Sequence, residues 1–169
     1  NKKSLFLKAK KIANHGGLKK NNHIIIGRNS RLDNIQAGIL NIKLNYLDKW
    51  ISLREKQAKF YKYNLEGVGD IKFIKQIENS KSSNHLFVIK TGKRNELKEY
   101  LLRNGISTAI HYPSPLPQLP VFRKKHKSYA IKMNATRWKN SIISLPIGEH
   151  MHPLKLKKVC LCIKSFFDA

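Results

Sequence analysis

A stripe of apolar residues in the first third of the chain constrains the fold most strongly. Its members recur at intervals of three and four residues, which is the spacing of one face of an α-helix. The stripe consists of Leu32, Ile35, Ile39, Ile42, Tyr46, Trp50 and Leu53, with Leu47, Ile51 and Ala58 widening it. The sequence therefore predicts one long amphipathic helix.

Ser30 and Asp33 mark the predicted start of this helix. Their spacing fits a capping box, in which both side chains satisfy free amides of the first turn. Asn29 precedes the cap and adds an amide donor, while Arg28 and Arg31 add guanidinium groups. Because a helix N-terminus attracts anions, this corner suits a phosphate group. A capped helix with solvated arginines is the alternative interpretation of the local pattern.

The rest of the chain predicts an α/β fold with a domain boundary after residue 64, where a Gly-rich turn ends the long helix. This boundary would separate residues 1–64 from an α/β domain of residues 65–169. The expected helices are 4–14, 95–103, 129–138 and 153–167, and the expected strands are 85–90, 106–112 and 141–145. Four prolines predict a fixed irregular loop between 113 and 120.

His111 and Tyr112 form a second candidate site, because they end a predicted strand just before the proline loop. A histidine can donate or accept a hydrogen bond near neutral pH, and a tyrosine offers a hydroxyl and a flat face. The segment 149–152 contains two histidines, but their spacing matches no known zinc site. Cys160 and Cys162 point to different sides of a helix, so we expect burial rather than a disulfide.

The formal net charge of +24 raises the possibility of a basic nucleic-acid-binding protein. Lysine is spread along almost every segment, however, without a basic arm or a finger motif. AT-rich coding drift explains the charge more simply, and a basic field would still attract an anionic substrate. No apolar run reaches membrane-spanning length and no export signal is visible, so we expect a cytoplasmic protein.

Taken in order, several short motifs resemble the C-terminal part of the DegT/StrS-type nucleotide-sugar aminotransferases. The motifs are Asn14-His15-Gly16, the G-x-N-x-R-L-x-x-x-Q-A signature over 27–37, His85-Leu86-Phe87-Val88-Ile89, Gly105-Ile106-Ser107-Thr108, Ile110-His111-Tyr112-Pro113 and Ser144-Leu145-Pro146. Two positions depart from the pattern. Pro117 replaces a common histidine, and Gly38 replaces the usual alanine inside the helix. The resemblance covers nearly the whole chain.

This resemblance implies the aspartate-aminotransferase fold (fold type I), with residues 1–64 as the end of the large domain and the connecting helix and residues 65–169 as the small C-terminal α/β domain. It also implies a homodimer with its active site at the interface. It implies that Asn29 reaches the phosphate of pyridoxal 5'-phosphate in the neighbouring subunit, and that Arg31 lies near both the cofactor and the sugar. It further implies that His111 and Tyr112 line the nucleotide-sugar pocket.

The implied reaction transfers an amino group, usually from glutamate, to a keto group of a nucleotide-linked sugar. The Schiff-base lysine of the family belongs to an S-F-x-x-x-K element that is absent from these residues, so the chain would be inactive alone. The missing initiator Met would fit a chain that begins mid-protein. A related sugar dehydratase, in which histidine replaces that lysine, stays an alternative.

Overall fold

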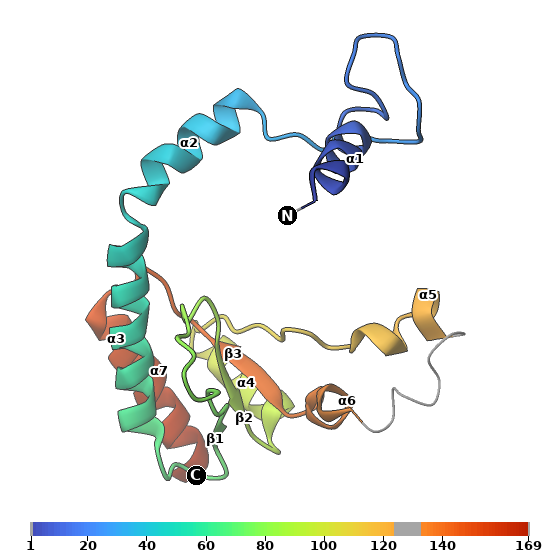
Figure 1. The fold of residues 1–169 in the computed structure, drawn as a ribbon. Helices are drawn as coiled ribbons and strands as arrows, with labels where there is room; N and C mark the ends of the chain where they lie inside the picture. Colours follow the sequence, from blue (N-terminus) through green and yellow to red (C-terminus); the bar gives the residue numbers. More distant parts are fainter. Residues whose placement is uncertain (1, 124–132, 169) are drawn as a thin grey trace. The chain divides into compact units, whose positions relative to one another are not determined.

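The computed structural model describes residues 2–123 and 133–168, and its contacts divide the chain into two units, residues 1–47 and 48–169 (Figure 1). The predicted domain boundary after residue 64 concerns a complete protein and stays a prediction. Within this chain, helix α3 (Leu47–Leu65) belongs almost entirely to the second unit. It does so because Ala58, Tyr61 and Leu65 are buried in that unit's core.

The first unit contains two helices, α1 (Lys3–Ala13) and α2 (Asn34–Leu44), joined by a loop. The predicted helix over 4–14 is confirmed. It ends where His15 and Gly16 adopt left-handed backbone, with φ of 56° and 89°. A Cβ atom on Gly16 would lie 1.7 Å from the carbonyl oxygen of Ile25, so this close approach requires glycine.

The prediction of one long helix is wrong, because the apolar stripe is divided between α2 and α3. At the break, Asn45 N–H donates to the carbonyl of Ile42 at 3.3 Å, and Tyr46 N–H donates to that of Lys43 at 3.0 Å. The three-residue bonds tighten the last turn of α2.

The predicted cap at Ser30 is also wrong. Asp33 is the N-cap of α2 and forms a capping box with Gln36, whose Oε1 accepts from Asp33 N–H at 3.3 Å. Ser30 N–H instead donates to the carbonyl of Ala13 at 2.9 Å. Ser30 is therefore paired with the end of α1 and is not the N-cap of α2.

The second unit is built on a three-stranded antiparallel sheet in the order β1-β2-β3. The strands are β1 (Lys72–Phe73), β2 (Phe87–Lys90) and β3 (Ile142–Leu145). Phe87 lies opposite Leu145 and Ile89 opposite Ile143, so these four apolar side chains share one face. That face packs in a single core with apolar residues of α3, α4 (Arg94–Arg103) and α7 (Pro153–Asp168).

The predicted strands 85–90 and 141–145 and the helices 95–103 and 153–167 are confirmed. The expected strand over 106–112 is wrong: only Ala109 pairs, in one bridge with Ser144. Antiparallel continuation from this bridge would place Ser107 opposite Pro146, which has no N–H group to donate. The short strand β1 was not predicted.

The proline loop contains the 3-10 helix η1 (Leu116–Gln118) and the short helix α5 (Pro120–Arg123). Of the expected helix 129–138, the structure shows α6 (Asn134–Trp138), and residues 129–132 lie outside the described residues. Cys160 and Cys162 are both free thiols, as expected.

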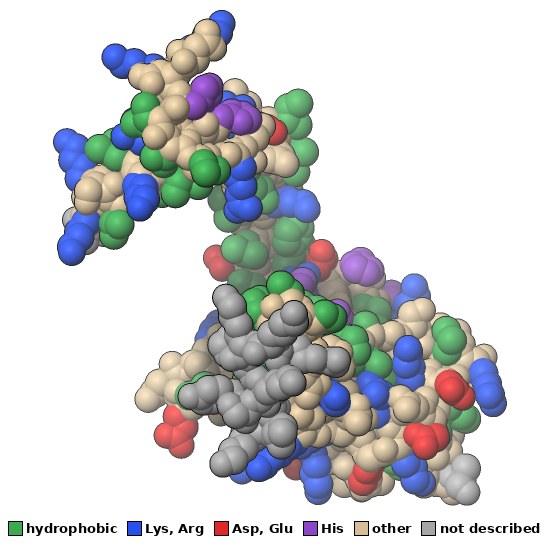
Figure 2. All heavy atoms as spheres, turned by 90° about the vertical axis from the view of Figure 1, so that its right-hand side faces the viewer, with side chains coloured by type: hydrophobic (Ala, Val, Ile, Leu, Met, Phe, Trp, Pro, Cys, Tyr) green, Lys and Arg blue, Asp and Glu red, His purple; other side chains and the backbone are tan. Residues whose placement is uncertain are grey.

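Surface properties agree with the composition. On the face drawn in Figure 2, Lys and Arg side chains occur over both units rather than in one patch. Within 2–123 and 133–168, none of the helices combines the length and hydropathy needed to cross a membrane.

Candidate functional site

Asn29 and Arg31 belong to one hydrogen-bonded cluster in the first unit. Arg31 Nε donates to Oδ1 of Asn29 at 3.1 Å, and its Nη1 donates to Oδ1 of Asn14 at 3.0 Å. Asn14 in turn donates through Nδ2 to the carbonyl of Gly17 at 2.8 Å. The guanidinium group is therefore held by two amide oxygens from separate segments.

Backbone pairing fixes the two segments that carry this cluster. Asn14 and Asn29 form an antiparallel bridge, flanked by hydrogen bonds from His15 N–H to the carbonyl of Arg28 and from Ser30 N–H to that of Ala13. Gly27 makes the close approach possible, since a Cβ there would lie 2.2 Å from the backbone nitrogen of Gly16. The cluster thus rests on a β-bridge, whereas the sequence placed Asn29 at a helix start.

The donor chemistry of the cluster fits the phosphate group of pyridoxal phosphate. Because Oδ1 of Asn29 already accepts from Arg31, its Nδ2 amide is the part left to donate to an anion. Arg31 carries a positive charge beside it and further N–H groups. The helix dipole of α2 is not part of this argument, since Asp33 rather than Asn29 adjoins that helix.

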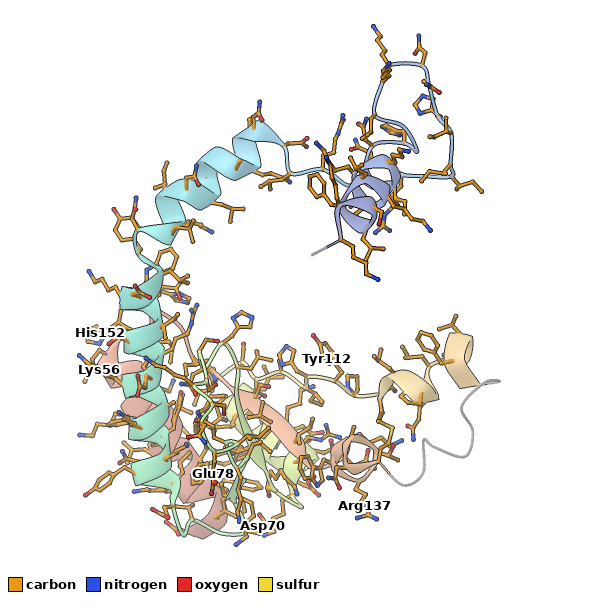
Figure 3. All side chains as sticks on the ribbon, viewed as in Figure 1. Lys56, Asp70, Glu78, Tyr112, Arg137 and His152 are labelled. Atoms are coloured by element: carbon orange, nitrogen blue, oxygen red, sulfur yellow. The ribbon has the colours of Figure 1, made fainter. Side chains whose placement is uncertain are left out.

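His111 and Tyr112 lie in the second unit, beside the outer edge of β3. Nδ1 of His111 is 2.9 Å from Oγ of Ser144. The rings of His111 and Tyr112 lie edge to face, with their centroids 5.5 Å apart. The side chain of Tyr112 is 72% exposed and extends from the segment before η1 (Figure 3). His111 is half-buried, so the pair combines one fixed and one solvent-facing group.

A shallow open hollow of about 250 Å³ lies beside His111. Its polar lining comes from His85, Ser107, Thr108, His111 and Ser144, and its apolar lining from Leu86, Ala109, Leu145, Pro146 and Ile147. Oγ1 of Thr108 is buried and has no hydrogen-bond partner among the described residues. The hollow is therefore a small, mostly neutral surface with several potential hydrogen-bonding groups.

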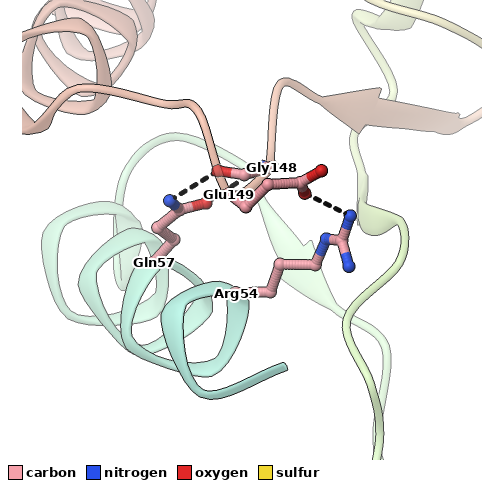
Figure 4. Close-up of polar contacts among 4 residues, drawn as sticks. All are labelled: Arg54, Gln57, Gly148 and Glu149. Atoms are coloured by element: carbon pink, nitrogen blue, oxygen red, sulfur yellow. Dashed lines mark hydrogen bonds and ion pairs between the residues drawn. The ribbon is translucent and has the colours of Figure 1, made fainter. Parts of the chain in front are cut away.

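Helix α3 holds one wall of this hollow through three side chains at helical spacing. Tyr61 donates its hydroxyl to the carbonyl of Pro146 at 2.7 Å. Gln57 donates to the carbonyl of Gly148 at 2.8 Å and accepts from its N–H at 3.0 Å, and Arg54 pairs with Glu149 at 2.5 Å (Figure 4). Burial raises the pKa of the Tyr61 phenol well above its ordinary value, so it stays a donor at neutral pH.

The predicted site residues therefore form two pairs, Asn29 with Arg31 and His111 with Tyr112, in different units. Among the described residues, no group of three His, Cys, Asp or Glu side chains could hold a metal ion. Sequence reasoning missed the roles of Asn14 and Ser144. Side chains alternate between the two faces of a strand, so Ser144 of the predicted strand 141–145 points away from the apolar face of Ile143 and Leu145. This alternation was the available signal for Ser144.

Comparison with known proteins places the chain in a class of sugar aminotransferases. Residues 1–164 match the DegT/DnrJ/EryC1/StrS aminotransferase family, and the chain belongs to that family. Enzymes of this family depend on pyridoxal phosphate. The predicted family is thereby confirmed.

Individual relatives agree with this assignment. The dTDP-3-amino-3,4,6-trideoxy-alpha-D-glucose transaminase of Streptomyces venezuelae is 33% identical over 93% of this chain and 41% of its own length. The UDP-2-acetamido-2-deoxy-3-oxo-D-glucuronate aminotransferase of Pseudomonas aeruginosa is 31% identical over 92% of this chain and 42% of its own. The solved structure of Streptomyces venezuelae DesV superposes with a TM-score of 0.89 at 28% identity, covering 99% of this chain and 45% of that one. The chain thus spans less than half the length of these relatives.

Proposed function

We propose that this chain is the C-terminal portion of a pyridoxal-phosphate-dependent aminotransferase that converts a nucleotide-linked keto-sugar to an amino-sugar, with glutamate as the donor. The match of residues 1–164 to the family carries the proposal. Residues 1–64 would complete a large domain and the connecting helix, and residues 65–169 would form the small domain. The active site would lie at a homodimer interface, with the Schiff-base lysine supplied by the remaining portion.

The cluster around Arg31 would bind the cofactor phosphate of the neighbouring subunit. Nδ2 of Asn29 would donate to a phosphate oxygen, while Arg31 supplies a cation held by the amide oxygens of Asn29 and Asn14. When bound, pyridoxal phosphate supplies the conjugated ring that takes up negative charge from the carbon exchanging its amine. Arg31, His111 and Tyr112 would contact the nucleotide sugar.

The test is to combine the chain with an N-terminal portion from its family and to measure bound cofactor and amino transfer. We expect a yellow complex that moves an amino group from glutamate to a dTDP- or UDP-linked keto-sugar, the nucleotide classes of the relatives' substrates. A complex that stays colourless with added pyridoxal phosphate would overturn the proposal.

Asn29→Ala tests the phosphate contact directly. Loss of one hydrogen bond to a charged group should cost about 1.5–3 kcal/mol, so the cofactor should dissociate about 10- to 100-fold more readily. The measurement is the visible absorbance that remains after gel filtration and its titration with added cofactor. Asn41→Ala, at an exposed position of α2, is the matched control and should retain cofactor like the parent. Equal retention by both variants would remove Asn29 from the cofactor site.

A further inference from the structure

Ser144 occupies an unusually well-fixed position beside the hollow. Its backbone N–H donates to the carbonyl of Ala109 at 2.8 Å, and its carbonyl accepts from Ala109 N–H at 3.2 Å. Only 4% of the residue is exposed, and its neighbours Ile143 and Leu145 face the core on the other side of the sheet. The hydroxyl is therefore held on the hollow side of β3 by the backbone of the strand itself.

The hydroxyl of Ser144 has one polar partner among the described residues, which is Nδ1 of His111 at 2.9 Å. If neutral His111 donated from Nδ1, Oγ of Ser144 would be the acceptor, and the hydroxyl proton of Ser144 would have no acceptor among the described residues. An unpaired buried donor costs free energy. Donation by Ser144 to Nδ1 avoids this cost. It fixes neutral His111 in the tautomer that carries its proton on Nε2.

We propose that Ser144 is a positioning residue that holds His111 so that its Nε2–H donates to an acceptor oxygen of a ligand in the hollow. The identity of this ligand as a nucleotide sugar rests on the function proposed above. The acceptor is then a phosphate or hydroxyl oxygen of that substrate. Ser144 does not touch the ligand in this arrangement. It acts by selecting the tautomer and the orientation of the imidazole.

Another hydroxyl in the same hollow does not bond to His111. Oγ1 of Thr108 also lines the hollow and is buried, yet it bonds neither to His111 nor to any other described residue. The ring is therefore paired with the hydroxyl of the rigid strand β3. The hydroxyl on the segment outside the regular strands is not used.

The first experiment measures the tautomer of His111 in the full chain by long-range ¹H–¹⁵N correlation at a pH where the imidazole is neutral. His111→Ala identifies the signals. We expect a pyridine-like Nδ1 and a pyrrole-like Nε2 in the parent and in Ser144→Thr. In Ser144→Ala the two nitrogen shifts should converge towards a tautomeric average. Unchanged His111 shifts in Ser144→Ala, or a pyrrole-like Nδ1 in the parent, would overturn the proposal.

The second experiment uses the cofactor-loaded complex. Ser144→Ala should raise KM for the nucleotide sugar about 5- to 10-fold, the loss expected for one weakened hydrogen bond, with little change in kcat and in cofactor absorbance. Ser144→Thr should restore KM, and Ser165→Ala, at an exposed position of α7 outside the hollow, should leave it unchanged.

A double-variant cycle separates positioning from a general structural effect. If Ser144 acts through His111, Ser144→Ala should add nothing to the KM of a His111→Ala variant. A full further increase on that background would overturn the proposal. Should the unmodified complex show no amino transfer, the proposed function would fail, whereas the tautomer measurement would still decide the role of Ser144.

Discussion

At the scale of single residues, Asp70 shows how one carboxylate joins two turns of the second unit. Its Oδ1 accepts from the Thr91 hydroxyl at 2.5 Å and its Oδ2 from Gly92 N–H at 2.6 Å. These bonds connect the turn before β1 to the turn that leads into α4. Partial burial, the largest single effect, would raise the pKa of Asp70. The hydrogen bonds from Thr91, Gly92 and its own N–H, together with the charge of Lys93, outweigh it and hold the pKa below its ordinary value of 3.8.

This lowered pKa predicts a contribution of Asp70 to acid sensitivity. The contribution is complete above the ordinary value and is lost as the pH falls through the lowered one, since the folded state then loses its preference for the carboxylate. Asp70→Asn should reduce the free energy of unfolding at pH 7 by about 0.5–1 kcal/mol, a small effect because water screens the site. It should also flatten the fall in stability below about pH 4.

Urea unfolding of parent and variant at several pH values measures both effects of Asp70→Asn. Glu78→Gln, at an exposed position, removes the same charge and should leave the free energy of unfolding at pH 7 unchanged. An Asp70→Asn variant with the parent's stability at pH 7 would contradict the expectation.

Residue patterns selected Asn29 and Arg31 as candidate site residues but specified no contact between them. The contact of Arg31 with Asn14 and that of His111 with Ser144 depend on backbone bridges between distant segments, which local patterns do not specify. The family resemblance identified the segments that contain these residues. Which of their atoms form hydrogen bonds depends on the tertiary structure.

At the scale of elements, α2 has no buried residue, as is also true of α1, whereas α3, α4 and α7 each bury three or more. Ile35 is 80% exposed and Ile42 65%, so this chain alone does not cover the apolar stripe. The stripe was predicted correctly as helical, but the break at Asn45 and Tyr46 was not. Hydrophobic periodicity detects apolar residues that recur on one helix face. It does not detect a short break between two helices when the apolar residues keep the same spacing across the break.

The glycine inside α2 gives a test at this scale. A Cβ on Gly38 would meet no atom within 4 Å, so Gly38→Ala should stabilise the helix by about 1 kcal/mol through backbone entropy and raise the helical circular dichroism. Gly105→Ala should do the opposite, because Gly105 ends α4 with a φ of 71°. Equal effects of the two changes would contradict this account.

At the scale of the whole molecule, the two units differ in how they are held together. Every buried apolar side chain of the described residues lies between Ala58 and Ile163, in the second unit. The first unit instead depends on the backbone contacts around Gly16 and Gly27. The α/β character of the second unit was predictable from alternating and helical patterns. The antiparallel strand order was not, because it depends on pairing between distant segments.

This difference predicts that residues 48–169 fold without the first 47. We expect a cooperative thermal transition within about 2 °C of the full chain, since the truncation removes no core residue and Tm follows the free energy of that core. Binding of a hydrophobic dye should fall, because the exposed apolar side chains of α1 and α2 are gone. Calorimetry and dye fluorescence measure the two effects. The absence of a cooperative transition would show that the first 47 residues are required for folding.

The three contacts of α3 with the segment 146–149 have a mechanical consequence. Arg54, Gln57 and Tyr61 occupy one side of the helix over two turns, and each grips a different point of that segment. A rotation of α3 about its own axis would therefore displace Pro146, Gly148 and Glu149 together. Because Pro146 and Ile147 line the hollow, a movement of α3 would change the position of this wall of the hollow.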